Sequence, residues 1–258
     1  MIGSITLLAL SVIAIQDKGI TPTLVAAYSP EAEAAFDMMQ QGQGADALYT
    51  LSEDALQRGG WEPAPGDVIF FDVTMPEMTR AAISIIDAPP GECADPRLAR
   101  LIADCNIDYS QDQNLVRFGR TTFANLDEDG NLIPRDEYDD LLSTYIEEMA
   151  HSWQEFMFET EGRGYGTRSR PINWTEGLYW AQGWEYQAKM YVLSLDGGLL
   201  QISDAERETL RDNICSPDGY ANPTGQNVMP YSAPAGWPNP DGWPVAVPTP
   251  EALETFCE

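Results

Sequence analysis

Basic residues are scarce in this 258-residue sequence, and histidine is almost absent from it. The chain contains one histidine, His151, and two lysines, Lys18 and Lys189, while 41 acidic residues against 14 lysines and arginines leave a formal charge of -27. Affinity for nucleic acid depends on basic side chains that neutralise phosphates. We therefore expect no nucleic-acid partner, and a surface whose negative field attracts cations.

The lone histidine excludes several catalytic classes. The sequence has no GxSxG motif, no CxxC pair and no internal repeat. A ferritin-like di-iron site needs an ExxH motif on each of two helices, which one histidine cannot supply. Any Ser-His-Asp or Cys-His arrangement would have to use the same His151, and the sequence lacks the nucleophile motifs that accompany such arrangements.

Long apolar runs are also missing. The run at residues 2–15 is too short to span a bilayer comfortably as a helix. It is typical of the hydrophobic region of a signal peptide, with small residues around Ala14 for cleavage. We predict that residues 1–27 are a signal peptide or an N-terminal anchor and that no stable membrane span follows them. The protein is then exported, to the periplasm or the cell exterior.

The four cysteines are even in number and lack the spacing of a zinc ribbon, so disulfides are their expected use. Of the three connectivities, we prefer Cys93 with Cys105 and Cys215 with Cys257. Each bridge would hold an irregular or proline-rich stretch, and disulfides agree with export.

Hydrophobic periodicity predicts an α+β fold. One domain is expected over residues 28–213, followed by a tail rich in proline, glycine and tryptophan over residues 214–258. The expected helices cover residues 30–41, 52–57, 95–105, 135–160, 175–195 and 203–213, and the expected strands cover residues 68–73, 81–86 and 115–123. The last helix begins with a capping-box pattern, Ser203 followed by Glu206.

The histidine lies in the helix expected over residues 135–160, within the sequence YIEEMAHSWQ at residues 145–154. Residues four apart project from one face of a helix, so Glu147 and His151 are neighbours there, and Glu148 lies three residues before the histidine. An imidazole and carboxylates at this spacing are typical of a metal site on a helix. The alternative is a histidine on an amphipathic helix, hydrogen-bonded to a neighbouring carboxylate.

The sequence Glu147-Glu148-Met149-Ala150-His151, followed by Ser152-Trp153-Gln154, resembles the HExxHxxQ form of zincin-like metallopeptidase domains of the gluzincin type. Downstream, WEYQA at residues 184–188 is similar to the ExxA segment of those domains, and the resemblance covers about residues 115–195. It implies a small sheet packed on the active-site helix and a second helix that carries a ligand. Glu147, His151 and Glu185 would bind the metal, with Glu176 as the competitor of Glu185, and Glu148 would be the general base.

This resemblance implies a peptide or protein substrate, lying extended along the strand expected over residues 115–123. The sequence departs from the family where Glu147 replaces the first histidine. Two carboxylates and one imidazole form a harder, more negative ligand set, so iron or manganese become alternatives to zinc. The alternatives to a peptidase are an inactive pseudopeptidase that kept the fold and an extracellular binding or scaffold protein.

A second cation site is suggested by residues 125–136, which match much of a calcium loop. Asn125, Asp127 and Asp129 would supply oxygens, Gly130 the turn, and Asp136 the last ligand. The first position is asparagine, the last is aspartate, and the preceding segment is predicted as a strand. An acidic turn that leads from this strand into the motif helix is therefore the alternative interpretation.

Overall fold

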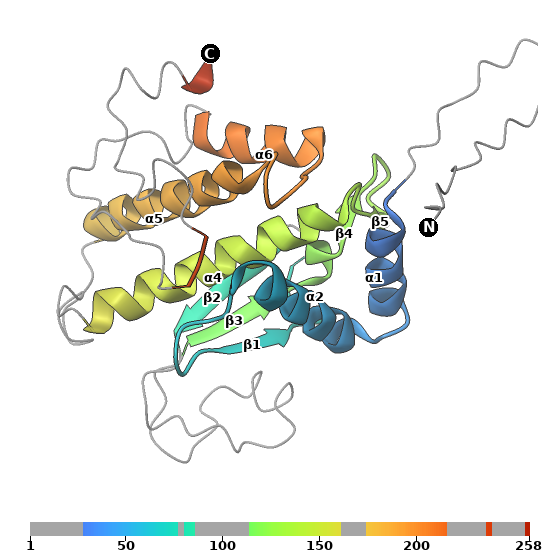
Figure 1. Cartoon of the computed structure of the whole chain (residues 1–258), viewed down its shortest axis with the longest axis horizontal. Helices are drawn as coiled ribbons and strands as arrows, with labels where there is room; N and C mark the ends of the chain where they lie inside the picture. The colour runs from blue at the N-terminus through green and yellow to red at the C-terminus, as the bar shows by residue number, and fades with distance from the viewer. Residues whose placement is uncertain (1–27, 77–79, 86–113, 161–173, 216–235, 239–255) are drawn as a thin grey trace, which may run out of the picture.

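The chain folds into helices packed around two small sheets (Figure 1). The computed structural model describes residues 28–76, 80–85, 114–160, 174–215, 236–238 and 256–258. The expected α+β composition is confirmed over these residues. The leader, the helix expected over residues 95–105 and the Cys93–Cys105 bridge lie outside them.

The larger sheet has three strands, β1 (Val68–Phe71), β2 (Ala81–Ile85) and β3 (Asn114–Phe118), in the order β1-β3-β2. Strand β1 runs parallel to β3, and β2 runs antiparallel to it, with Ile83 opposite Val116. Both edges of β3 are therefore paired. The expectation that a substrate lies along the edge of this strand is wrong, because β3 is the central strand.

The strand predicted over residues 115–123 ends at Phe118. Gly119 N–H and Thr122 Oγ1 both donate to the carbonyl oxygen of Arg80, each at 2.7 Å, and draw the chain into the 3-10 helix η1 (Arg120–Thr122). A hairpin of β4 (Ala124–Leu126) and β5 (Leu132–Pro134) follows. Two hydrogen bonds to the distant Arg80 carbonyl thus end the strand early. Such bonds leave no trace in the periodicity of the sequence.

Two helices precede the sheet. Helix α1 (Pro30–Gln40) was predicted, and the Ser29 side chain caps its first turn by accepting from Ala32 N. Helix α2 (Gly44–Gly59) is much longer than the segment expected over residues 52–57. Its additional turns bury Ala47, Leu48 and Leu51 at helical spacing. It ends at Gly60, whose φ of 66° is a conformation that glycine adopts readily.

Helix α4 (Tyr138–Thr160) lies between the three-stranded sheet and α5 (Trp174–Leu195), and α6 (Asp204–Cys215) lies beyond α5 (Figure 1). These three helices agree with the predicted ones. Tyr145 on α4 stacks on Phe118 of β3, with ring centroids 5.4 Å apart. The core residues of α4 recur every three or four positions and are fully buried: Leu141, Leu142, Ile146 and Met149.

The C-terminal tail is tied to the body by the predicted Cys215–Cys257 disulfide. Residues 236–238, one of its two described pieces, pack on α5. Trp237 is buried and stacks on Tyr191, whose hydroxyl donates to the carbonyl of Pro238 and accepts from Trp61 Nε1. Among the described residues, none of the helices combines the length and apolar character that crossing a membrane requires.

Candidate metal centre

Helices α4 and α5 bring the three predicted metal ligands together. Glu147 and His151 lie one turn apart on α4, and Glu185 lies on α5. One ligand atom of each lies within 4.8 Å of the other two, which no other His, Cys, Asp and Glu trio achieves within the described ranges. His151 Nε2 lies 3.5 Å from Glu185 Oε1 and 4.0 Å from Glu147 Oε1. The predicted convergence is therefore observed.

The packing of α5 on α4 explains why Glu185 points inward. Ala188 and Val192, which follow Glu185 on the same helix face, are fully buried. The Glu185 side chain is 30% exposed, at the margin of this face. Glu176, its competitor in the sequence, belongs to α5, but its side chain lies outside the described part of the structure.

A chain of hydrogen bonds orients the imidazole. His151 Nδ1 lies 2.9 Å from Gln154 Oε1, and Gln154 Nε2 donates to Gln187 Oε1 at 3.2 Å. An amide oxygen only accepts, so Nδ1 carries a proton and Nε2 is the nitrogen that faces the two carboxylates. His151 Nε2 is buried and has no hydrogen-bond partner among the residues described.

The helix is also anchored beside the imidazole. Ser152 Oγ donates to Asp67 Oδ2 at 2.6 Å and accepts from Ala64 N at 2.8 Å. Trp153 Nε1 donates to the carbonyl of Glu62. These three bonds join one turn of α4 to the segment before β1, so the position of His151 is determined by the body of the fold.

The charged groups at the site shift one another's pKa values. Burial alone lowers the pKa of His151, but the carboxylates of Glu185, Glu148 and Glu147 outweigh it and raise the pKa to about 9. Burial alone raises the pKa of Glu185, but His151 and Lys189 lower it to about 2. Without a metal, the imidazole is therefore a cation held against carboxylates.

Glu148, the predicted base, is 8% exposed. Burial raises the pKa of its carboxyl to about 8, although the cations at His151 and Lys189 act in the opposite direction. A carboxyl whose pKa lies near neutral pH suits a general acid or base.

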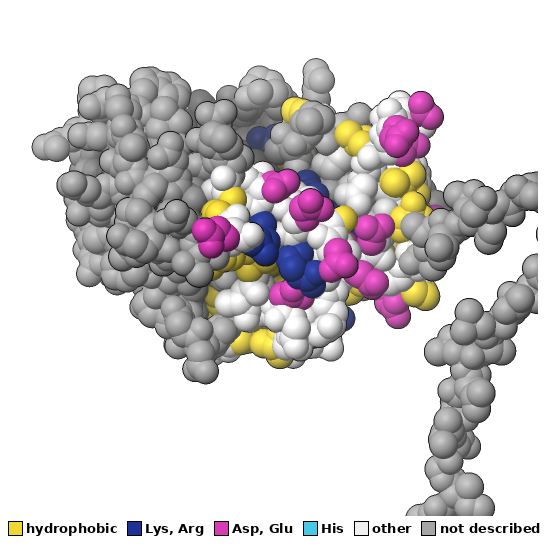
Figure 2. All heavy atoms as spheres, turned by 90° about the horizontal axis from the view of Figure 1, so that it is seen from above, with side chains coloured by type: hydrophobic (Ala, Val, Ile, Leu, Met, Phe, Trp, Pro, Cys, Tyr) yellow, Lys and Arg dark blue, Asp and Glu magenta, His cyan; other side chains and the backbone are white. Residues whose placement is uncertain are grey.

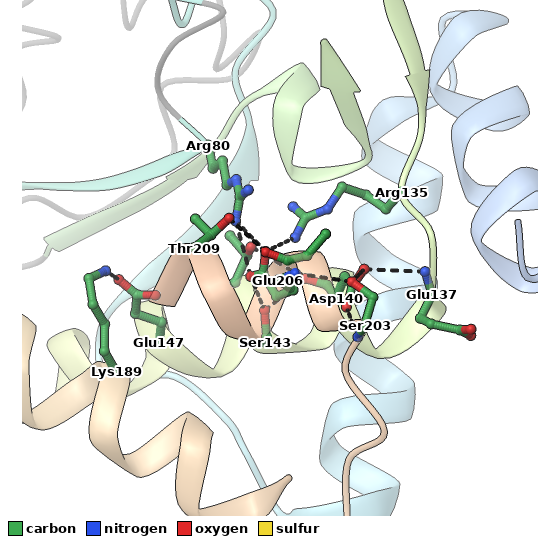
Figure 3. A network of polar contacts seen from close by, with 12 residues as sticks. Arg80, Arg135, Glu137, Asp140, Ser143, Glu147, Lys189, Ser203, Glu206 and Thr209 are labelled. Atoms are coloured by element: carbon green, nitrogen blue, oxygen red, sulfur yellow. Dashed lines mark hydrogen bonds and ion pairs between the residues drawn. The ribbon is translucent and has the colours of Figure 1, made fainter. Parts of the chain in front are cut away.

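Lys189 is a fourth member of the site, which sequence reasoning missed. Its ammonium donates to Glu147 Oε1 and lies 3.3 Å from Glu185 Oε2, and its side chain is 7% exposed (Figure 3). Two signals in the sequence pointed to it. It is one of only two lysines, and it follows Glu185 by four residues on the inward face of α5.

A second group of polar and charged side chains, most of them buried, lies one turn away along α4, and we call it the Glu206 cluster: Arg80, Arg135, Asp140, Ser143, Ser203 and Glu206 (Figure 3). The Glu206 carboxylate accepts from Arg80, from Arg135 at 2.6 Å and from Ser143 at 2.6 Å. Two nitrogens of Arg135, Nε and Nη1, are buried without a partner among the described residues.

The predicted capping box at Ser203 is confirmed only in part. Ser203 Oγ accepts from Glu206 N at 3.1 Å, as expected at the start of a helix. In a full capping box the glutamate side chain would accept from the serine backbone. Here Asp140 Oδ1 accepts from Ser203 N at 2.8 Å, because the Glu206 carboxylate is engaged by the arginines.

Outward from these clusters, the face of the molecule on the α6 side carries acidic side chains around a small basic group (Figure 2). Arg207, for example, is ion-paired with Asp196 and Asp204. The acidic surface expected from the composition is thus seen on this face.

The suggested calcium loop forms the turn between β4 and β5. Asp127 Oδ1 accepts from Asp129 N at 3.0 Å and from Asn131 N at 2.8 Å, and Gly130 has a φ of 81°. The Asp136 carbonyl accepts from Ser29 N. Asn125 pairs with Ile133 in the hairpin. This geometry agrees with the acidic turn that the sequence left open, and the calcium site stays a prediction.

Comparisons with models of protein families, with curated proteins and with solved structures found no match.

Proposed function

We propose that this protein is a metal-dependent peptidase of the zincin type, which binds one divalent metal through Glu147, His151 and Glu185. The observation that supports the proposal is the convergence of the three side chains that the sequence pattern predicts as ligands. One ligand atom of each lies within 4.8 Å of the other two.

The residues present fit a metal ion. His151 Nε2 is a buried nitrogen with no hydrogen bond among the described residues, aimed between two carboxylates. Its other nitrogen is held by Gln154, as histidine ligands in metal sites are held by an outer partner. Two oxygens and one nitrogen suit zinc, and also iron or manganese.

A divalent ion at this position would act as a Lewis acid towards a substrate carbonyl and a water molecule. The chain itself supplies the proton transfer. Glu148, with its pKa raised to about 8, would take a proton from water at its carboxylate and return it to the leaving amine. A nearby cation favours the ionised carboxylate, so Glu148 becomes a base when the site is loaded.

One observation favours the alternative, a pseudopeptidase or binding protein without catalysis. Lys189 is paired with both Glu147 and Glu185, so the carboxylates have a counter-ion even when no metal is bound. For either function, the Cys215–Cys257 disulfide is consistent with an oxidising, exported environment, and we propose export on that ground.

Two variants separate the two functions. We expect the wild type, loaded with zinc, iron or manganese and dialysed, to retain about one metal per chain, and His151→Ala to retain none. Glu148→Gln keeps the metal and loses cleavage of an unfolded protein substrate. Glu208→Gln, on the exposed side of α6, is the matched control and changes neither. A wild type without metal after loading contradicts the proposal, and cleavage that persists in Glu148→Gln contradicts the role of the base.

A further inference from the structure

Lys189 contacts both carboxylate ligands. The two oxygens of Glu185 face different partners, Oε1 towards His151 and Oε2 towards Lys189. In Glu147 the ammonium donates to Oε1, the oxygen that also lies 4.0 Å from His151 Nε2. A cation thus lies against both carboxylates, and on Glu147 it contacts the oxygen that faces the imidazole.

The charge of Lys189 has a consequence for the unusual ligand set. Two histidines and one glutamate, the set in gluzincins, carry one negative charge. Two glutamates and one neutral histidine carry two, and the ammonium of Lys189 reduces the sum to one. The site therefore contains a side chain that offsets the replacement of histidine by Glu147.

We propose that Lys189 is a positioning residue that sets the charge of the metal site, so that the Glu-His-Glu set acts towards a divalent ion as a His-His-Glu set does. The inference rests on the proposed metal site. Its ammonium repels the bound ion and weakens binding, while it keeps the two carboxylates from attracting every hard cation of the medium.

The geometry supports this role over that of a remote counter-ion. The Lys189 side chain is 93% buried, so water screens its charge little. Helix α5 holds it one turn from Glu185, and its ammonium lies against both ligands in the metal-free protein. A counter-ion needed only for folding would stabilise the protein without affecting the affinity for metal.

The test measures zinc affinity by competition with a chromophoric chelator, and metal-induced thermal stabilisation, for the wild type and three variants. Lys189→Gln removes the charge and keeps a hydrogen-bond donor, and Lys189→Met removes both. Lys189→Arg keeps the charge and is the matched control. We expect Lys189→Gln to bind zinc about 10- to 100-fold more tightly than the wild type, because the variant lacks a buried cation that repels the divalent ion. Lys189→Arg should remain within about threefold of it, a small change on the same scale.

Each outcome decides between the claims. If the wild type binds zinc, and Lys189→Gln and Lys189→Met bind it equally or less tightly, the proposed role of Lys189 is wrong and the proposed metal site stands. If these variants bind zinc and the wild type does not, the charge of Lys189 opposes binding as proposed, but the proposed function of the natural chain is wrong. Absence of binding in all of them overturns both. If Lys189→Met does not fold without metal, recovery of its cooperative melting by zinc still reports binding.

Discussion

Two clusters of charged side chains lie along helix α4, and they differ in how a buried carboxyl is shifted in each. In the Glu206 cluster, Arg80, Arg135 and Ser143 donate to one carboxylate. Burial alone would raise the pKa of Glu206, but the two arginines and the serine lower it below its usual range. In the metal centre, burial outweighs the nearby cations and raises the pKa of Glu148 to about 8.

This difference separates a structural cluster from a functional one. A buried charge that is fully paired is a stable part of the fold, and its loss is costly because its partner is left uncompensated. A buried acid whose pKa is raised by burial weakens the fold when it is charged, and such groups are typical of active sites. Buried nitrogens without a hydrogen bond occur in both clusters, as Arg135 Nε and Nη1 in one and His151 Nε2 in the other, and do not distinguish them. The following predictions test this contrast, from the largest expected effect to the smallest.

Of these variants, Glu206→Ala should lower the free energy of unfolding the most. It leaves Arg135 buried without an anion, so we expect a loss of about 3–5 kcal/mol in the free energy of unfolding. Urea denaturation followed by circular dichroism measures the loss. Glu208→Gln, exposed on the same helix, serves as the control, and an equal effect of the two would contradict a structural role for the Glu206 cluster.

Gln154→Leu should affect the metal centre and leave the Glu206 cluster unchanged. It removes the group that holds His151 Nδ1, so we expect the affinity for zinc to fall about 10- to 100-fold. Chelator competition measures the affinity. Gln201→Leu at an exposed position is the control. If Gln154→Leu binds zinc as tightly as the wild type, the imidazole is not oriented by this bond.

The carboxyl groups of Glu206 and Glu148 should contribute to stability with opposite pH dependence in metal-free protein. The pKa of Glu206 is lower in the folded than in the unfolded protein. Its contribution to the free energy of unfolding is therefore present above about pH 4.3, the pKa of the unfolded state, and is lost as the pH falls. The pKa of Glu148 is raised to about 8 in the folded protein. Its contribution to the free energy of unfolding is therefore present below the pKa of the unfolded state and is lost as the pH rises towards about 8.

Urea denaturation in chelator at several pH values checks this prediction. Glu206→Gln should be less sensitive to acid than the wild type, and Glu148→Gln should gain stability relative to the wild type as the pH rises from 5 to 8. Parallel pH profiles of Glu148→Gln and the wild type would show that the Glu148 carboxyl is not protonated by burial.

Ser143→Ala has the smallest expected effect. It removes one donor from Glu206 and leaves both arginines in place, so we expect a loss of about 1 kcal/mol. Ser52→Ala on α2, whose hydroxyl bonds only to the carbonyl of Tyr49, should cost less. Equal losses in the two variants would indicate that the serine contributes little to the cluster.

Local patterns in the sequence predicted much of the fold. The apolar periodicity of α4 and α5 and the Ser-Pro start of α1 identified these helices, and the cysteines near the C-terminus identified a disulfide. The errors lie where distant groups decide. The predicted strand over residues 115–123 was ended by bonds to the Arg80 carbonyl. Helix α2 was too short in the prediction because its glycine-flanked first turns had been assigned to a loop.

Glu147 and His151 were predictable because they form a local spacing on one helix, and Glu185 followed from the similarity of residues 184–188 to the ExxA segment of gluzincin-type domains. Lys189 was missed because a lone lysine on a helix is usually solvated. The side chain of Glu206 was assigned to a helix cap, whereas its partner Arg135 lies 71 residues away in the sequence. Contacts of that kind depend on how α6 packs beside α4 and α5, and a local sequence pattern does not predict that packing.

The most direct test of the central claim is anomalous diffraction from a crystal of the zinc-loaded protein. The account predicts one ion within about 2.0–2.2 Å of His151 Nε2 and of one oxygen each from Glu147 and Glu185. Zinc absent from these three side chains, with Lys189 still paired to both carboxylates, would contradict it.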